Sequence, residues 1–275
     1  MIKIITDSTA YLPKEFAKEN DITVLPLTVT IDNQEFSDTD TAQYDVFFER
    51  VEKSNSRPQS SQPNVELVTQ AFKKVLDEGN EAIAICISKT LSGTASTFEM
   101  VKNELDTENK ISVIDSGTVC QNIFLYIKQA LKMVNSGKPR EEVCKYLTDV
   151  QKTSFVSFIP ENLDSLKQGG RIGKVNYFIG HLLKIKPILL FKQGILTCTK
   201  KIIGMKNAIT ALIKSIPKNI KEIMVLKISK SIYYDELKQS VEKAFPNIPL
   251  SEGIVGPAVG THVGKAIGIS CLVEE

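Results

Sequence analysis

Short apolar runs alternate with amphipathic stretches along the first 155 residues of the chain. Residues 2–5, 82–87 and 111–114 form three such runs, each followed by polar residues, as expected of strands buried on both faces of a sheet. Helical spacing of apolar residues is found in the segments 44–51, 64–76, 95–105, 120–135 and 139–151. This alternation predicts a parallel sheet with helices on both sides.

Two segments of this half are less regular. The β-branched stretch 22–31 predicts one further strand, which closes at Asp32. Residues 53–64 are rich in Ser, Asn, Gln and Pro, and this composition predicts a loop. We expect Asn64 to cap the helix that follows and Gly79 to end it.

The pattern changes near residue 155. Further strands are predicted at 154–159, 188–191, 195–201 and 222–228, and further helices at 206–215 and 233–245. The Lys-Gln-Gly turn between the second and third of these strands indicates a hairpin. We therefore predict an α/β protein of two domains, a Rossmann-like parallel sheet with flanking helices over residues 1–155 and an α+β domain over residues 156–275.

The composition argues against several kinds of partner. The chain has 34 basic and 32 acidic residues, and this net charge of +2 gives no electrostatic reason to bind nucleic acid. Five cysteines without a C-x-x-C pair, and two histidines, argue against a zinc site and a disulfide framework. No stretch approaches the roughly 18 apolar residues of a membrane span. We expect a cytoplasmic protein with reduced thiols, no signal peptide and at most transient peripheral membrane contact.

Three polar segments are predicted where a loop meets a helix or strand end: Ser60-Ser61-Gln62-Pro63, Ser92-Gly93-Thr94 and Gly260-Thr261-His262. Ser92 precedes a helix, whose first amides point outward with partial positive charge. Gly93 lacks a Cβ, so a ligand can approach the backbone there. With the hydroxyls of Ser92 and Thr94, this segment predicts a site for one carboxylate or phosphate, although a simple cap by Ser92 explains the same residues.

The other polar residues allow both a structural and a functional interpretation. A hydroxyl before a helix usually caps it, so Ser60 alone favours a cap. His262 is predicted in a glycine-rich loop, where it is either a structural residue or a group that binds an anion or acts as a base. Arg171 has a fork geometry that suits a carboxylate of the protein or of a ligand. His181 lies beside two leucines in a predicted helix, and we interpret it as structural.

Two kinds of enzyme are competing hypotheses. Ser92, His262 and either Asp7 or Asp115 are the residue types of a hydrolase triad, but the pattern G-x-S-x-G is missing. A phosphotransfer component that acts on another small anion stays open, because amides at a helix start bind phosphate equally well. The chain has neither a P-loop motif nor G-x-G-x-x-G after a strand, so the sequence predicts no ATP or dinucleotide site.

Several motifs, in one order along essentially the whole chain, resemble those of the DegV family. They are Thr6-Asp7-Ser8, Ser60-Ser61-Gln62-Pro63, the segment 88–94, Ile114-Asp115-Ser116, the segment 166–172, Lys186-Pro187-Ile188-Leu189 and the segment 256–264. One such motif is weak evidence, whereas the ordered set is specific.

The resemblance implies a two-domain fold that holds a long-chain fatty acid between the domains, with the acyl chain in an apolar tunnel. Some family members serve as the acyl-binding subunit of bacterial fatty acid kinase, in which a separate ATP-binding subunit phosphorylates the carboxylate. The resemblance thus implies a binding protein with no catalytic residue, metal or cofactor of its own. The residues implied to hold the carboxylate, by their positions in the motifs, are Ser60, Ser92, Gly93 and His262, with Thr94 and Arg171 in support.

Two segments depart from the family pattern. Cys120-Gln121-Asn122 stands where a Ser- and Gly-rich helix start is common, so we expect the tunnel floor to differ in shape. Ile203 and Met205 occupy positions that are often basic. If that stretch docks the kinase subunit, we expect the docking to differ here while ligand binding is unaffected.

Overall fold

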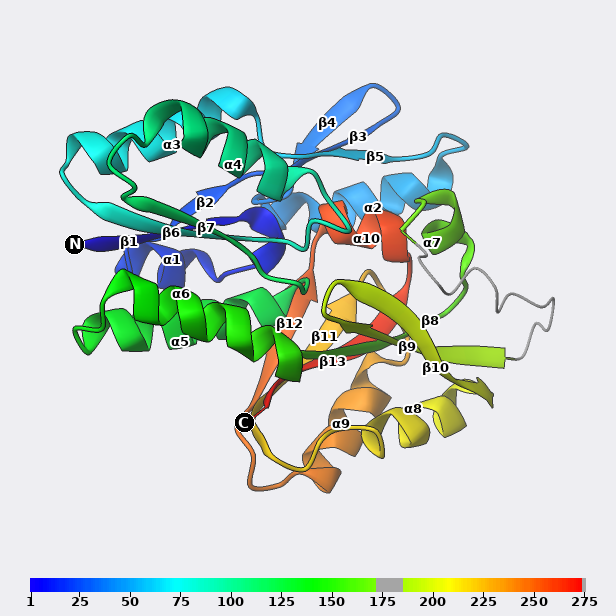
Figure 1. The fold of residues 1–275 in the computed structure, drawn as a ribbon. Helices are drawn as coiled ribbons and strands as arrows, with labels where there is room; N and C mark the ends of the chain where they lie inside the picture. Colours follow the sequence, from blue (N-terminus) through cyan, green and yellow to red (C-terminus); the bar gives the residue numbers. More distant parts are fainter. Residues whose placement is uncertain (172–184, 274–275) are drawn as a thin grey trace.

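The N-terminal half is built on a four-stranded parallel sheet. The computed structural model describes residues 1–171 and 185–273, and the strand order of this sheet is β2-β1-β6-β7 (Figure 1). Its strands are β1 (Ile2–Asp7), β2 (Thr23–Leu25), β6 (Glu81–Cys86) and β7 (Ile111–Asp115). The predicted parallel sheet is confirmed, and the three apolar runs are three of its strands.

Helices cover both faces of this sheet, which is why its strands are apolar without alternation. Successive side chains of a strand point to opposite faces: Ile4 and Ile83 belong to one core cluster, and Ile5 and Ala84 to another. Helices α5 and α6 pack in the first cluster, and α3 and α4 pack in the second. The helices of this half are α1 (Lys14–Glu19), α2 (Tyr44–Lys53), α3 (Val65–Asp77), α4 (Thr94–Leu105), α5 (Gln121–Asn135) and α6 (Arg140–Asp149).

Both predicted ends of α3 are confirmed. The Asn64 side chain accepts a hydrogen bond from Glu66 N at 2.8 Å and so caps the first turn. Gly79 follows the helix with a φ of 70°, and its N–H donates to Leu76 O at 2.9 Å. Glycine adopts this left-handed conformation without the steric cost of a Cβ, and the chain turns there into β6.

The single strand predicted over residues 22–31 is wrong, because the segment contributes to two different sheets. β2 pairs with β1 in the parallel sheet, whereas β3 (Thr28–Ile31) belongs to a separate antiparallel sheet of order β4-β3-β5. Pro26 lies between the two strands, and proline has no N–H to donate to a ladder. The break allows the chain to leave one sheet and enter the next.

The loop predicted over residues 53–64 also contains a strand. β5 (Gln59–Ser61) pairs with β3, with Ser60 opposite Val29, and β4 (Gln34–Ser37) pairs on the other side. Because β5 is a short edge strand of polar residues, it shows no apolar alternation that the sequence could reveal. The small sheet, and not a loop, therefore positions Ser60.

A six-stranded mixed sheet organises the C-terminal half, with the order β10-β9-β8-β13-β11-β12. Only β11 and β12 are parallel neighbours, and the predicted hairpin is confirmed as the antiparallel pair β9–β10. The strands are β8 (Phe155–Pro160), β9 (Ile185–Lys192), β10 (Ile195–Ile203), β11 (Ile220–Ile228), β12 (Leu250–Val255) and β13 (Ala266–Val273). Helices α8 (Met205–Ile213) and α9 (Tyr234–Ala244) cover one face and bury a core there.

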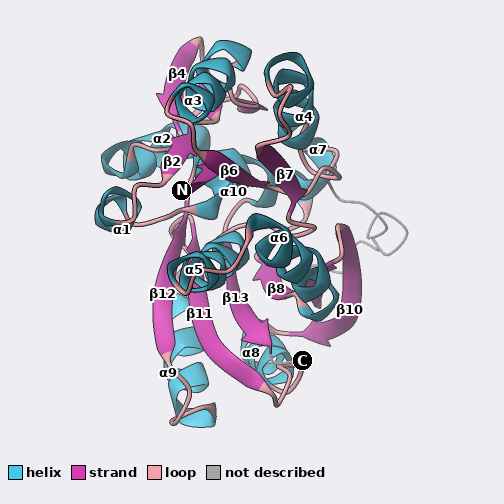
Figure 2. Cartoon of the chain, turned by 60° about the vertical axis from the view of Figure 1, so that its left-hand side comes forward, coloured by secondary structure: helices cyan, strands magenta, loops and turns pink. Residues whose placement is uncertain are grey.

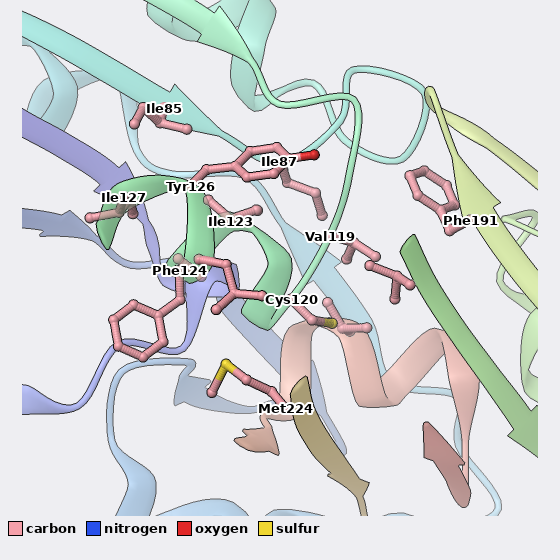
Figure 3. Close-up of a cluster of buried hydrophobic side chains, with 14 of the residues drawn as sticks. Ile85, Ile87, Val119, Cys120, Ile123, Phe124, Tyr126, Ile127, Phe191 and Met224 are labelled. Carbon is pink, nitrogen blue, oxygen red and sulfur yellow. The ribbon is translucent and has the colours of Figure 1, made fainter. Parts of the chain in front are cut away.

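Helix α5 lies between the two large sheets (Figure 2). Its buried residues join one continuous core cluster with Ile85 of β6 and Met224 of β11, and Figure 3 shows Ile123 and Phe124 of α5 between these elements. The α/β fold class is therefore confirmed, with a parallel N-terminal sheet and a mixed C-terminal one. The domain boundary at residue 155 stays a prediction, because this core belongs to both halves. None of the helices described is long and apolar enough to cross a membrane.

Candidate functional site

A cavity opens where the two large sheets, the small sheet and the short helix α10 (Pro257–Val263) meet. The cavity volume that is open to the centres of water molecules is about 160 Å³. This volume is roughly ten times what a single water molecule needs. Thr94 lies buried directly behind Ser92. The other five predicted site residues line the cavity wall: Ser60, Ser92, Gly93, Arg171 and His262.

His262 lies on a helix and not in the loop that the glycine-rich sequence predicted. Pro257 occupies the first turn of α10, where its missing N–H costs nothing. A Cβ on Gly260 would lie 2.6 Å from the Phe48 ring, so this glycine allows α10 to pack closely on α2. Close packing, rather than a flexible loop, explains the glycine content of this segment.

Ser60 and His262 form a hydrogen bond although 202 positions separate them in the chain. Their Oγ and Nε2 atoms are 2.7 Å apart, and which atom donates depends on the imidazole tautomer. β5 carries Ser60 and α10 carries His262, and both side chains line the cavity. If Nε2 holds the proton, the Ser60 hydroxyl is left to donate into the cavity.

His262 is neutral at physiological pH. Burial lowers the pKa of His262 to about 4, and the positive charges of Arg171 and Arg57 act in the same direction. Its Nδ1 atom is buried and has no hydrogen-bond partner among the described residues. A Cβ on Gly169 would lie 2.6 Å from this Nδ1, so glycine at the end of α7 (Asp164–Gln168) makes room for the ring.

The segment 92–94 forms the predicted helix start. α4 begins at Thr94, and the Ser92 Oγ atom accepts a hydrogen bond from Thr94 N at 3.3 Å and lies 2.9 Å from Thr94 Oγ1. The N-cap residue of α4 is Gly93, and no side chain caps the helix there, so the interpretation of Ser92 as a simple cap is not met, whereas Ser92 does line the cavity. The partial positive charge of the α4 N-terminus is thereby directed at the polar end of the cavity.

Gly93 is in close contact with Gln62. A Cβ on Gly93 would lie 2.1 Å from Gln62 Oε1, which is too close for any larger residue unless Gln62 moves. Gln62 Nε2 donates to Thr97 Oγ1 at 2.6 Å, which ties the segment after β5 to the first turns of α4. The absence of a side chain at Gly93 thus brings the two hydroxyl-bearing segments together.

Arg171 stands at the exposed mouth of the cavity. Its Nε donates to Leu91 O at 3.2 Å and its Nη1 to Gly169 O at 2.8 Å. These bonds use two of the five N–H donors of a guanidinium. They fix the positive charge beside the Ser92 segment.

The inner wall of the cavity is apolar. It is formed by Leu27, Ile87, Leu91, Val119, Phe158, Leu166, Phe191, Leu196, Ala258, Val259 and Val263. Ile87 directly follows β6, Val119 lies just before α5, and Phe191 comes from β9 (Figure 3). The cavity thus has a polar mouth and an apolar interior.

The structure does not form the hydrogen bonds that the hydrolase hypothesis requires. The hydroxyl that is hydrogen-bonded to His262 belongs to Ser60, whereas the Ser92 hydroxyl is hydrogen-bonded to Thr94. Asp7 accepts from Thr9 and Ile87, and its pKa is raised by burial. Asp115 instead accepts from the amides of residues 89 and 117. With no partner on its Nδ1 and a lowered pKa, His262 lacks the orienting carboxylate of a triad.

Sequence reasoning missed several residues of the cavity. Gln62 lies in the predicted Ser-Ser-Gln-Pro segment, so proximity to Ser60 was the signal that could have found it. Thr9 also lines the wall, next to the Thr6-Asp7-Ser8 motif. The apolar wall has no local signal, because its members come from several elements that are distant in the chain. His181, interpreted above as structural, lies outside the described residues.

The segments that depart from the family pattern lie away from the cavity wall. Val119 lines the cavity, but Gln121 and Asn122 do not. Asn122 instead donates to Ser154 Oγ and accepts from Ser270 Oγ at 2.8 and 2.9 Å, which ties α5 to the C-terminal sheet. The expectation that the tunnel floor differs in shape stays a prediction.

The two non-basic residues near β10, Ile203 and Met205, differ in their exposure to solvent. Met205 is 6% exposed and belongs to the core beneath α8, so it cannot contact a partner directly. Ile203, at the end of β10, is 67% exposed. Of these two residues, only Ile203 can change the surface that a partner protein would contact.

Comparison with known proteins identifies the family. The profile described as "Uncharacterised protein, DegV family" matches residues 1–274. The chain belongs to the DegV family. A DegV domain-containing protein of Clostridium acetobutylicum is 32% identical over 282 residues, covering 100% of this chain and 98% of the relative. The family resemblance that the motifs indicated is confirmed.

Two solved structures of similar proteins share the fold. A fatty-acid-binding DegV family protein from Thermus thermophilus is 25% identical with a TM-score of 0.90, covering 99% of both chains. A stearic acid-binding protein from Eubacterium ventriosum is 25% identical with a TM-score of 0.87, covering 99% of this chain and 98% of the other. These likenesses extend over both halves of the DegV chain.

Proposed function

We propose that this DegV protein binds one long-chain fatty acid, with its carboxylate at the polar mouth of the cavity and its acyl chain inside. The observation that supports this most directly is the Ser60–His262 hydrogen bond beside Ser92 at one end of an apolar cavity. The similar proteins that bind fatty acid or stearic acid support the same ligand class. A free phosphate would fill the mouth but leave the apolar wall without a partner.

The acyl chain and the carboxylate of the fatty acid contribute to binding in different ways. Each CH₂ group removed from water contributes about 0.8 kcal/mol, so the acyl chain supplies most of the affinity. A buried carboxylate needs hydrogen-bond donors, because an unpaired buried charge is costly. Since His262 is neutral, the donors proposed are the Ser60 and Ser92 hydroxyls, the Gly93 amide and the Arg171 guanidinium, with Thr94 orienting Ser92.

Mass spectrometry and one substitution test the ligand. Organic extraction of the purified protein, after incubation with palmitate, is expected to release one acyl chain per protein. Ser92→Ala removes a hydrogen bond to a charged group and is expected to weaken palmitate binding about tenfold or more in a calorimetric titration.

Ser96→Ala is the matched control, because Ser96 is exposed on the same helix and does not line the cavity. Equal palmitate affinities for the wild type and for Ser92→Ala would remove Ser92 from the site. Absence of any stoichiometric acyl chain would contradict the ligand class.

We further propose that the protein presents the carboxylate to a separate ATP-binding subunit and has no catalytic role of its own. The exposed positions of Gly93 and Arg171 at the cavity mouth support this, because they leave the head group within reach of a partner. Ile203, which stands where family members often have a basic residue, is exposed on β10 and does not line the cavity.

Trapping with hydroxylamine tests this role, since acyl phosphates react with it to give hydroxamates. With palmitate, ATP and Mg²⁺, hydroxamate is expected only when the ATP-binding subunit from the same cell is added. Hydroxamate formed by this chain alone would show it to be an enzyme. No hydroxamate in either case would contradict the kinase partnership and leave the palmitate titration unaffected.

A further inference from the structure

The first turn of α10, the helix that carries His262, is held by two side chains that lie outside the cavity wall. Asp38 Oδ1 accepts a hydrogen bond from Ala258 N at 2.8 Å. Tyr11 OH accepts from Val259 N at 3.2 Å and lies 3.3 Å from Gly256 O, to which it donates. His262 follows one helical turn after Ala258. These contacts therefore fix the end of the helix that precedes the imidazole.

Asp38 is itself immobilised on the N-terminal half. It is 1% exposed, and its second carboxyl oxygen accepts from Ser8 Oγ at 2.9 Å. The same Ser8 Oγ accepts from Leu27 N at 3.0 Å, and Asp38 N donates to Leu27 O at 3.0 Å. The carboxyl group thus joins η1 (Ser8–Ala10) and the chain before β3 to the N-terminus of α10.

Packing around Gly256 leaves little room for this turn to move. Tyr44 OH donates to Asp38 O at 2.5 Å, and the Tyr11 and Tyr44 rings meet edge to face at 6.5 Å. A Cβ on Gly256 would lie 2.5 Å from the Tyr44 ring and 2.7 Å from the Tyr11 ring. A displacement of the first turn would therefore require these rings to move as well.

We propose that Asp38 is a positioning residue, which holds the first turn of α10 and thereby sets the His262 imidazole against Ser60. A short helix transmits a shift at Ala258 to His262 almost undiminished, and a hydrogen bond of 2.7 Å tolerates only a small shift. The consequence for ligand affinity rests on the proposed function, whereas the placement of His262 does not.

The surroundings of Asp38 make the role one of shape and hydrogen bonding rather than of charge. Burial raises the pKa of Asp38 to about 7, and the Asp7 carboxylate acts in the same direction, against the hydrogen bonds from Ala258 N and Ser8. The Tyr44 and Cys120 side chains also face it and have raised pKa values because of burial. Either protonation state can accept from Ala258 N, and so can the amide oxygen of asparagine.

Nitrogen NMR of the histidine ring tests the placement directly and without a ligand. The chain has only two histidines, so a His181→Gln background leaves one labelled imidazole. Asp38→Ala is expected to shift the ring nitrogen signals of His262 and to raise its pKa from about 4 toward 6.5, because the ring loses Ser60 and gains water. Asp38→Asn is expected to restore both values.

Asp40→Ala is the matched control, since Asp40 lies two residues away and its side chain, among the described residues, accepts only from the Ala42 amide of the short helix η2 (Thr41–Gln43) and from the Gln43 side chain. Should Asp38→Ala not fold, Asp38→Ser takes its place, because a serine hydroxyl is too short to reach Ala258 N. A folded Asp38→Ala or Asp38→Ser protein with wild-type His262 signals would overturn the proposal.

A double-mutant cycle separates this proposal from the proposed function. Asp38→Ala is expected to weaken palmitate binding about fivefold, as for the loss of one helix cap, and to have no further effect in a His262→Ala background. An equal loss in both backgrounds would mean that the effect bypasses His262, and the proposal would fail. If no variant, Ser92→Ala included, changes palmitate affinity while the NMR shift occurs, the ligand is wrong and the positioning role stands.

Discussion

His262 and Asp38 are joined by one short helix, yet burial shifts their titrations in opposite directions. Removal from water disfavours the charged form of each group, so the pKa of His262 falls to about 4 and that of Asp38 rises to about 7. At pH 7 the imidazole therefore adds no positive charge to the cavity mouth. In the proposed function, an anionic head group would therefore be held by the Ser60 and Ser92 hydroxyls, the Gly93 amide and Arg171.

The two shifts predict opposite pH dependences of stability. Between pH about 4 and 6.5 the unfolded chain binds a proton at His262 that the folded chain does not, so this residue lowers stability as the pH falls. Relative to His262→Gln, the wild type is expected to lose up to about 3 kcal/mol of unfolding free energy between pH 7 and pH 4. Urea unfolding at a series of pH values measures this difference.

Asp38→Asn is the informative counterpart. The folded chain holds a proton on Asp38 up to pH about 7, whereas the unfolded chain releases it near 3.8, so the wild type loses stability relative to Asp38→Asn as the pH rises through this window. The two difference curves should have opposite slopes. If the unfolding free energies of both variants followed that of the wild type in parallel at every pH, neither pKa would be shifted by burial.

At the scale of elements, the polar mouth is assembled from the ends of three segments that are distant in the chain. β5 brings Ser60, the start of α4 brings Ser92, and α10 brings His262. The contact between Gly93 and Gln62 sets the separation of the first two. The site therefore depends on a contact that involves no ligand group.

Gly93→Ala is expected to destabilise the protein and to weaken palmitate binding, because the new methyl group must displace Gln62 from Thr97. Overpacking of this kind costs about 1–3 kcal/mol. The backbone at Gly93 has a φ of −74°, which alanine adopts without strain. Thermal unfolding and the palmitate titration measure the two effects.

The double variant Gly93→Ala with Gln62→Ala provides the control, since it removes the atom that the methyl group meets. We expect it to recover most of the stability lost in Gly93→Ala. If both single variants and the double variant lose the same amount, the contact between these residues does not set the geometry of the site.

The same elements show how far the sequence could lead. Strands buried on both faces are predictable because their apolar runs are continuous, and the Ser92 segment is predictable because a hydroxyl and a glycine before a helix can form an anion site. β5 was missed because a polar edge strand carries no periodic signal. α10 was interpreted as a loop because glycines that permit close packing resemble glycines of a turn. The apolar wall could not be predicted, since its residues meet only through the tertiary fold.

At the scale of the molecule, α5 packs against both large sheets and joins them through one core. The core cluster that surrounds it includes residues of both large sheets, and Lys128 of α5 pairs with Glu222 of β11 at 2.6 Å. The cavity lies between the same two sheets. Separating the halves would expose this core to water, at about 25 cal/mol for each Å² of apolar surface.

This shared core predicts that the ligand-free protein unfolds in one cooperative transition, despite having two separate large sheets. Scanning calorimetry should give one peak whose calorimetric and van't Hoff enthalpies agree. Palmitate at about 100 times its Kd would add about 2.7 kcal/mol of stability, which moves the midpoint by roughly 5–10 °C. Two peaks, or a ligand shift confined to one of two peaks, would show that residues 1–155 and 156–275 unfold as independent domains. In that case α5 would belong to only one of them, and the surface between the sheets would be an interface rather than a core.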